Sequence, residues 1–401
     1  MKKSQFFLTF FVFLVSAFFA CKKEEILLSS ELPSTKDPVK STEVTIQYLG
    51  EMLFYDPILS GNKDVACATC HHPNFSFSDG RDLAIGVNGV GLGPQRRFQS
   101  DVFSLINRRS MTILNTVFNG MDSKGNYDST NAPMFWDSRV KSLEEQALLP
   151  IKSELEMRGN AYPEAVAIDS VLNRLKNISE YRVLFSKIFN GDQPITSLNL
   201  ARAIASFERT LVAMNSPYDR YLRGDKEAMS ELEIRGMNAF EVDGCNKCHS
   251  GKMFSDYKLH TLSVPDNPRL DNTDKGANGS YGFRTTSLRN IKQTGPYMHN
   301  GVFKTLEEVI EFYNLIEKEK SQNPNVPVAK IDSLVKFLRP VNEKAAIVAF
   351  LGALTSDYDF PPPKRVPSNL SVGGNIKLGI NIPNSVHKFF DFRKFLFEIY
   401  N

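Results

Sequence analysis

The sequence has few cysteines, histidines and tryptophans: its 401 residues include 5 Cys, 6 His and 1 Trp. Four of the cysteines lie in two closely spaced pairs, which leaves too few for the disulfide framework of a small secreted domain. Neither charge dominates, because 48 Lys and Arg stand against 45 Asp and Glu. A balance this close to neutral lacks the basic excess of a nucleic-acid-binding protein, so we expect no nucleic-acid partner.

Long hydrophobic runs are also missing, apart from residues 6–20. This run is too short for a transmembrane helix and follows two lysines, a pattern that predicts a signal peptide at 1–20. Cys21 comes next and is the expected lipidation site of a lipoprotein, with simple cleavage as the alternative; residues 21–41 then read as a tether. We expect an exported protein on the periplasmic side, held to the membrane only by its lipid, with cell-surface exposure as the other option.

Two motifs of the form Cys-x-x-Cys-His, at 67–71 and 245–249, contain four of the five cysteines and two of the six histidines. In this pattern the two thiols form thioethers to a haem and the adjacent imidazole ligates its iron. A zinc site or a local disulfide is the alternative for each cysteine pair, but a histidine follows immediately in both. The sequence therefore predicts two covalently bound haem c groups, attached through Cys67, Cys70, His71, Cys245, Cys248 and His249.

The apolar periodicity predicts a mainly α protein with long irregular loops. Helical patterns occur at 42–54, 143–149 (ended by Pro150), 163–176, 180–189, 196–212, 230–240, 305–313, 331–338 and 342–354. Capping boxes at Ser230 with Glu233 and at Thr305 with Glu308 mark two helix starts. A break at 215–217 separates the predicted domains, which are an N-terminal haem domain (42–214), a C-terminal haem domain (215–358) and a tail packing on the body (359–401). The two haem domains are cytochrome c-like and are expected to face each other.

Four further stretches follow the motif order of the bacterial di-haem cytochrome c peroxidase family, which includes MauG. They are 49–57, 135–139, 215–219 and 294–301, and the chain resembles this family over roughly residues 43–358. The resemblance implies that the haem of His71 reduces hydrogen peroxide. It also implies that the haem of His249 relays electrons from a donor.

By the same resemblance, Gln146 and Glu156, which lie ten and twenty residues after Trp136, occupy the peroxide side of the first haem. A carboxylate in that place carries a proton from one peroxide oxygen to the other. An exposed helix-surface carboxylate is the alternative for Glu156, and Glu154 is the competing candidate. Trp136 resembles the aromatic residue placed between the two haems for electron transfer, and a buried core anchor is its alternative.

Two departures from typical members concern the remaining iron ligands. The stretch 79–99, an irregular loop that we expect over the first haem, contains no His, so that haem should keep an open site when oxidised and need no reductive activation. At the second haem, the position of the usual Met ligand looks like Tyr313, similar to the Tyr ligand of MauG. Met298 is the competing ligand, and a place in the buried helix stripe is the other alternative. An anionic phenolate would lower the potential of that iron.

The resemblance also implies a calcium ion between the haem domains. Its expected ligands are the backbone carbonyls of Thr294 and Pro296 and an Asn side chain near the first haem. The Asn of the family does not align cleanly with this chain, which leaves Asn107 as the candidate.

The leading hypothesis is a cytochrome-c peroxidase that reduces hydrogen peroxide to water. Its electrons would come from a small redox protein, a cytochrome c or a cupredoxin, through the C-terminal haem. MauG-like oxidation of a partner protein is one alternative, and a non-catalytic di-haem electron carrier is another. The main objection to a non-catalytic electron carrier is that Gln146 and Glu156 have the spacing found in the peroxidases. The sequence leaves the electron donor and a homodimer open.

Overall fold

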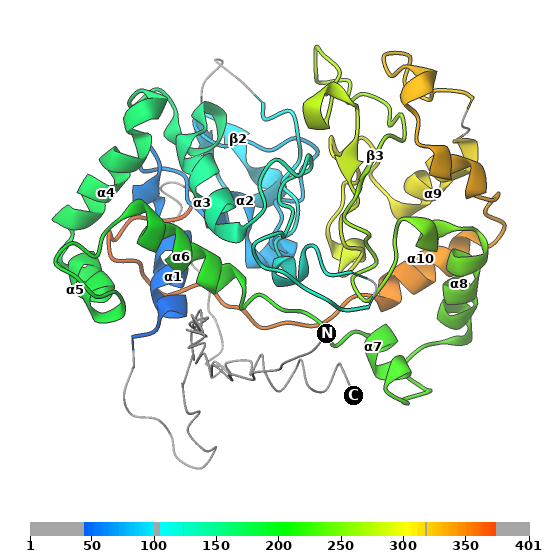
Figure 1. Ribbon diagram of the computed structural model, residues 1–401, viewed down its shortest axis with the longest axis horizontal. Coiled ribbons are helices and arrows are strands. Elements are labelled where there is room, and N and C mark those ends of the chain that lie inside the picture. The colour runs from blue at the N-terminus through cyan, green and yellow to red at the C-terminus, as the bar shows by residue number, and fades with distance from the viewer. Residues whose placement is uncertain (1–43, 100–104, 123, 317–318, 374–401) are drawn as a thin grey trace, which may run out of the picture. The chain divides into compact units, whose positions relative to one another are not determined.

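The computed structural model describes residues 44–99, 105–122, 124–316 and 319–373, and helices form most of its regular structure (Figure 1). This confirms the prediction of a mainly α protein. No helix within these ranges is long and apolar enough to span a membrane. The predicted signal peptide, Cys21 and the tether lie outside the described residues. The helices are α1 (Ile46–Phe54), α2 (Cys67–Cys70), α3 (Leu143–Lys152), α4 (Ala167–Asn177), α5 (Ser179–Ile188), α6 (Ser197–Glu208), α7 (Pro217–Leu222), α8 (Glu231–Val242), α9 (Leu306–Leu315) and α10 (Lys344–Ala353).

Two short antiparallel strand pairs lie within the loops. They are β1 (Gly89–Val90) with β2 (Arg97–Phe98), and β3 (Leu259–His260) with β4 (Phe283–Arg284). The paired residues are Gly89 with Phe98, Val90 with Arg97, Leu259 with Arg284, and His260 with Phe283. The first pair falls inside the stretch 79–99, which is therefore more ordered than the predicted irregular loop.

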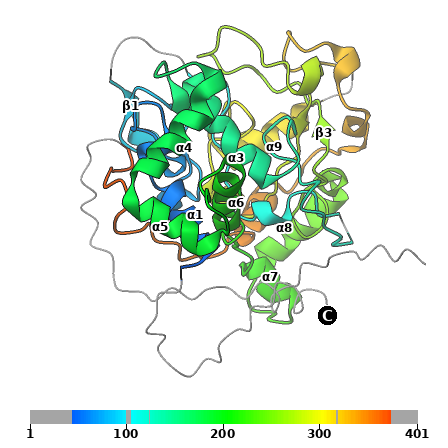
Figure 2. The same cartoon turned by 60° about the vertical axis from the view of Figure 1, so that its left-hand side comes forward.

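The helix before each haem motif crosses a later helix at a glycine. We call residues 44–214 the first half and residues 215–373 the second half. In the first half α1 packs on α6, which also contacts α3 (Figures 1 and 2), and in the second half α8 packs on α10. A methyl group at Gly50 of α1 would collide with the Ala203 carbonyl, and one at Gly236 of α8 would collide with the Ala346 carbonyl. The two halves therefore use the same close crossing to position their motifs.

Each half also buries an apolar cluster of its own. The largest cluster of the first half joins α1, α4, α5 and α6 around Leu53, Tyr181 and Ile204. That of the second half surrounds Phe240 of α8 and Phe350 of α10. The division into two haem domains and its boundaries stay predictions.

Two helix starts agree with the sequence and two helical segments differ from it. Both predicted capping boxes are present, at the starts of α8 and α9. The prediction that Pro150 ends its helix is wrong, because α3 continues to Lys152. Proline lacks one N–H group, so in the last turn it costs a single helical hydrogen bond and the helix ends soon afterwards. The segment predicted as a helix at 331–338 contains a 3₁₀ helix, Ser333–Phe337.

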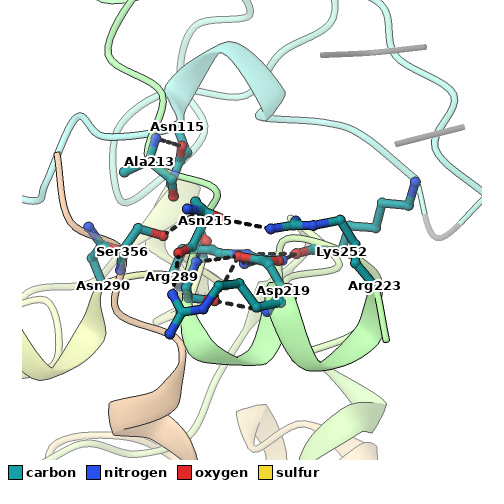
Figure 3. A network of polar contacts seen from close by, with 12 residues as sticks. Asn115, Ala213, Asn215, Asp219, Arg223, Lys252, Arg289, Asn290 and Ser356 are labelled. Carbon is teal, nitrogen blue, oxygen red and sulfur yellow. Dashed lines mark hydrogen bonds and ion pairs between the residues drawn. The ribbon is translucent and has the colours of Figure 1, made fainter. Parts of the chain in front are cut away.

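A polar network fixes the crossover between the halves (Figure 3). The Asn115 side chain accepts from the Ala213 amide at 2.7 Å and donates to the Ala213 carbonyl at 3.1 Å. Four residues into the second half, Asp219 forms an ion pair with buried Arg289 at 2.6 Å. The chain thus enters α7 along a fixed path.

The described part of the tail contacts the first half. Val366 and Val372 belong to an apolar cluster that includes Phe77, which follows the first haem motif. The hydroxyl of Ser368 donates to Asp56 at 2.5 Å. Residues 374–401 of the predicted tail lie outside the described residues.

Candidate haem sites

The first motif lines a cavity of about 600 Å³, which we call the first cavity. Cys67 and Cys70 are free thiols on α2, and both face this cavity together with His71. Neither cysteine pair forms a disulfide. Within the described ranges, no group of three or more His, Cys, Asp and Glu side chains is arranged to hold a metal ion. The zinc and disulfide alternatives therefore gain no support, and the two thiols remain available for thioether bonds.

Both motif histidines are oriented through the same backbone contact. Nδ1 of His71 lies 3.1 Å from the Phe77 carbonyl, and Nδ1 of His249 lies 3.1 Å from the Phe254 carbonyl. A ring N–H that donates to a carbonyl leaves Nε2 as the free acceptor, which is the form that binds iron. Phe77 and Phe254 have φ values of 53° and 52°, a rare conformation for bulky residues. Burial lowers the pKa of both imidazoles, so the neutral ring is favoured.

The three predicted catalytic residues line this same first cavity. Gln146 comes from α3, Glu156 from the single wide helical turn Glu154–Arg158 that follows it, and Trp136 from the loop before it. Burial raises the pKa of the Glu156 carboxyl, and the Arg139 charge opposes this rise. The alternative of an exposed surface carboxylate thus does not describe Glu156. It describes Glu154 instead, whose side chain is 60% exposed and pairs with Arg158.

The backbone of Glu156 is held by the stretch 79–99. The amide of Val87 donates to the Leu155 carbonyl at 3.2 Å, and Gly86 packs so closely on Glu156 that a β-carbon there would collide with its backbone. Arg96, which is 2% exposed, fixes this stretch from inside. Its guanidinium donates to the carbonyls of Ile85, Gly86 and Gly91 over 2.5–2.9 Å.

Sequence reasoning missed a second carboxyl group in the first cavity. Glu208, at the end of α6, is 5% exposed and lines the cavity with Cys67. Burial raises its pKa to about 8, and Oε2 has no hydrogen-bond partner within the described structure. The available signal was its position four residues after Ile204 and eight after Leu200, on the apolar stripe of a helix.

The second motif lines a smaller cavity of about 210 Å³, the second cavity. Cys245, Cys248 and His249 border it, and so do Tyr313 of α9 and Met298. Burial raises the pKa of the Tyr313 phenol. Both candidate ligands thus lie at this cavity.

The two histidines near the second cavity have partners of their own. His260 lies between Asp332 at 2.6 Å and Asp256 at 3.0 Å. His299 stacks on Phe283 with ring centroids 3.7 Å apart. Both imidazoles are thus held in place by neighbouring side chains, while His387 lies outside the described residues.

Trp136 lines both cavities, as do Arg109, Thr273, Asp274 and Arg284. Its indole N–H donates to the Arg109 carbonyl at 3.1 Å, and its own carbonyl accepts from the Arg284 amide at 2.7 Å. The side chain is only partly buried. Trp136 therefore lies at the boundary of the two cavities.

The expected calcium ligands do not fit a calcium site. The Thr294 carbonyl accepts a hydrogen bond from the buried guanidinium of Arg109, so a positive charge already lies beside its oxygen. Asn107 is exposed. It lines the first cavity, which neither Thr294 nor Pro296 borders. Calcium needs six to eight converging oxygen ligands, and these residues do not provide that arrangement.

The residues at both cavities do fit haem c. Each cavity offers two free thiols, one oriented imidazole and a mostly apolar wall. Nε of Arg109, at the boundary of the cavities, is buried without an acceptor within the described ranges. A haem carries two carboxylate groups, and a buried unpaired guanidinium N–H is a suitable donor for one of them.

Comparisons with known proteins agree with this arrangement. A family model described as di-haem cytochrome c peroxidase matches residues 45–227. The cytochrome-c peroxidase IdrP1 of Pseudomonas sp. (strain SCT) is 32% identical over 360 residues, covering 81% of this chain and 84% of that protein. The methylamine utilization protein MauG of Methylophilus methylotrophus is 32% identical over 316 residues, covering 76% and 81%.

A solved structure gives the same result. A MauG-like protein associated with microbial copper homeostasis superposes with a TM-score of 0.63 at 26% identity, covering 81% of this chain and 94% of that one. The relatives include both peroxidases and MauG proteins, and membership of their family implies two haem c groups. The chain therefore belongs to the di-haem cytochrome c peroxidase family.

Proposed function

We propose that this protein is a peroxidase that reduces hydrogen peroxide to water at the first cavity, with electrons that enter singly through the haem of the second. The observation that carries this proposal is that Gln146 and Glu156 line the cavity into which Cys67, Cys70 and His71 open. These side chains therefore border the space in which the first haem would lie.

A bound haem c supplies the redox-active iron at which the oxygen–oxygen bond is broken. The chain's part is to move protons and hold the substrate. Glu156 takes the proton from one peroxide oxygen and returns it to the other, which leaves as water. Gln146, which has no charge, orients the peroxide by hydrogen bonding. Two electrons and two protons balance the conversion of one peroxide to two waters.

Trp136 connects the two sites in this proposal. Because it lines both cavities, its indole is the aromatic group nearest to a path between them. The haem domains 42–214 and 215–358 then face each other across Trp136, with the peroxidatic haem on the N-terminal side. Electrons come from a small donor protein, a cytochrome c or a cupredoxin. The protein acts after export, on the periplasmic side, with Cys21 as its lipid anchor.

The stretch 79–99 favours a site that is open when oxidised. It contains no histidine, and Arg96 fixes it against the Glu156 turn. A ligand from this stretch would therefore have to be a weak one, and reductive activation is unnecessary.

A second candidate function is oxidation of residues on a partner protein, in the manner of MauG. Tyr313 at the second cavity favours it, since a phenolate ligand stabilises more oxidised iron than a thioether does. The relatives named MauG are about as similar as those named peroxidases. A simple electron carrier remains the least favoured function, because it needs neither Glu156 nor Gln146.

The test is the stoichiometry of turnover. Reduced cytochrome c or a reduced cupredoxin is mixed with limiting hydrogen peroxide and a catalytic amount of the holoprotein. The peroxidase proposal predicts two molecules of donor oxidised per peroxide. Peroxide consumption that stops once the protein itself has been oxidised, without donor oxidation, would reject it in favour of the MauG-like function, in which a partner protein supplies the electrons. No peroxide consumption would leave only the electron carrier.

A further inference from the structure

Arg109 is a buried cation that joins the two halves. The residue is 6% exposed. Burial lowers the pKa of its guanidinium to about 10, so this group stays charged at neutral pH. Nη2 donates to the Thr294 carbonyl in the second half and to the Ser78 hydroxyl in the first, the latter at 3.2 Å. One nitrogen thus connects the segment after the first haem motif with the segment that precedes α9.

The backbone of Arg109 makes two more contacts of this kind. Its amide donates to the His299 carbonyl at 2.9 Å, and its carbonyl accepts from the indole of Trp136 at 3.1 Å. Arg109 therefore fixes the place of Trp136 relative to the 294–301 stretch. The side chain and the backbone of Arg109 thus both connect the first half with the second half.

The surroundings of Arg109 suit one fixed cation. Asp79, buried and with an unpaired Oδ2 within the described ranges, is the largest favourable charge acting on the guanidinium. A divalent cation at the Thr294 carbonyl would lie a few ångströms from the guanidinium, and like charges that close repel strongly where water is excluded. The neighbouring Arg108 is already paired with Asp137 and Asp274.

We propose that the Arg109 guanidinium serves as the built-in cation between the haem halves, so that this protein needs no calcium. In this role Arg109 is a positioning residue, because it acts through Thr294 and Trp136. The proposal does not depend on the reaction at Glu156. It explains why the calcium ligand set expected from the resemblance does not converge in this chain.

The test begins with the wild-type holoprotein and calcium itself. We expect no stoichiometric calcium by elemental analysis after purification in calcium-containing buffer. We also expect no change in the thermal midpoint, or in the EPR spectrum of the oxidised haems, when EGTA or millimolar CaCl₂ is added. One tightly held calcium per chain, or a midpoint that falls with EGTA, would overturn the proposal.

Variants separate the charge from the bulk of the side chain. Arg109→Gln keeps most of the bulk without the charge and should lower the thermal midpoint by roughly 5 °C or more. It should also alter the EPR spectrum, whereas Arg109→Lys should recover part of both. Arg202→Gln, at an exposed position of α6, is the matched control and should change neither. An Arg109→Gln protein that behaves like this control would also overturn the proposal, even if peroxide turnover is normal.

Discussion

The indole N–H of Trp136 donates to the backbone carbonyl of Arg109 across 3.1 Å. The amide of the same Arg109 donates to the His299 carbonyl of the second half. Trp136 is the only tryptophan of the chain. The backbone of Arg109 therefore connects it with the second half. Residues of the first half and of the second half can be tested separately by substitution.

Replacing Glu156 with Gln should lower the peroxide turnover rate by roughly two orders of magnitude or more, because the amide cannot carry a proton. Haem content and thermal midpoint should stay near the wild-type values. Glu154→Gln is the matched control, since Glu154 lies in the same turn with its side chain 60% exposed. Equal rates for the two variants would show that the proton carrier is elsewhere.

Replacing Tyr313 with Phe should remove one oxygen ligand from the second iron. We expect the low-spin EPR signal and the visible spectrum of the oxidised protein to change, and the potential of that haem to rise if another ligand takes its place. Met298→Leu, at the same cavity, is the control and should leave the spectra unchanged. The assignment to Tyr313 is wrong if Met298→Leu alone alters the low-spin signal.

Glu208 should make stability depend on pH. Burial raises its pKa from 4.5 to about 8, so the folded protein keeps a proton that the unfolded chain loses. The stabilising effect is complete below pH 4.5 and is lost as pH rises toward 8.

The measurement is the free energy of unfolding, or the thermal midpoint, followed from pH 5 to pH 8. Wild type should lose stability along this range by an amount on the order of a few kcal/mol from this group alone. Glu208→Gln, which stays neutral, should show a clearly flatter profile. Parallel profiles for the two proteins would mean that Glu208 ionises normally in the fold.

Arg96 should control the order of the stretch 79–99. Arg96→Ala leaves three buried carbonyls without their donor, which should cost about 2 kcal/mol or more. Hydrogen exchange of the amides in 79–99 should speed up, including that of Val87. The neighbouring Arg97 is exposed, and Arg97→Ala should leave exchange unchanged. Wild-type exchange in Arg96→Ala would show that other contacts hold this stretch.

Local sequence patterns predicted the parts of this site that depend on local geometry. The two haem motifs and both capping boxes involve residues at most four positions apart, and the structure has the capping boxes where they were expected. The family resemblance, applied through the spacing from Trp136, predicted that Gln146 and Glu156 would lie at the first motif. The ends of helices were less predictable. The helix α3 continues past Pro150 because its packing on α6 outweighs one lost hydrogen bond.

The residues that sequence reasoning missed depend on contacts between distant segments. Arg109 and Thr294 are 185 positions apart, and no pattern near either one signals their hydrogen bond. Arg96 reads as a surface residue in a polar loop, although its side chain is among the most buried in the described structure. In both cases the fold supplies the carbonyl acceptors, and these have no signature in the side-chain sequence.

The most direct test of the central claim is to mix the fully oxidised holoprotein with hydrogen peroxide, without a donor, and follow the haem absorption bands by stopped flow. If the first site is open and Glu156 moves the proton, the bands should change rapidly in wild type and far more slowly in Glu156→Gln. No change in wild type until one electron is added would contradict the account, because it would mean that the first iron carries a sixth ligand when oxidised.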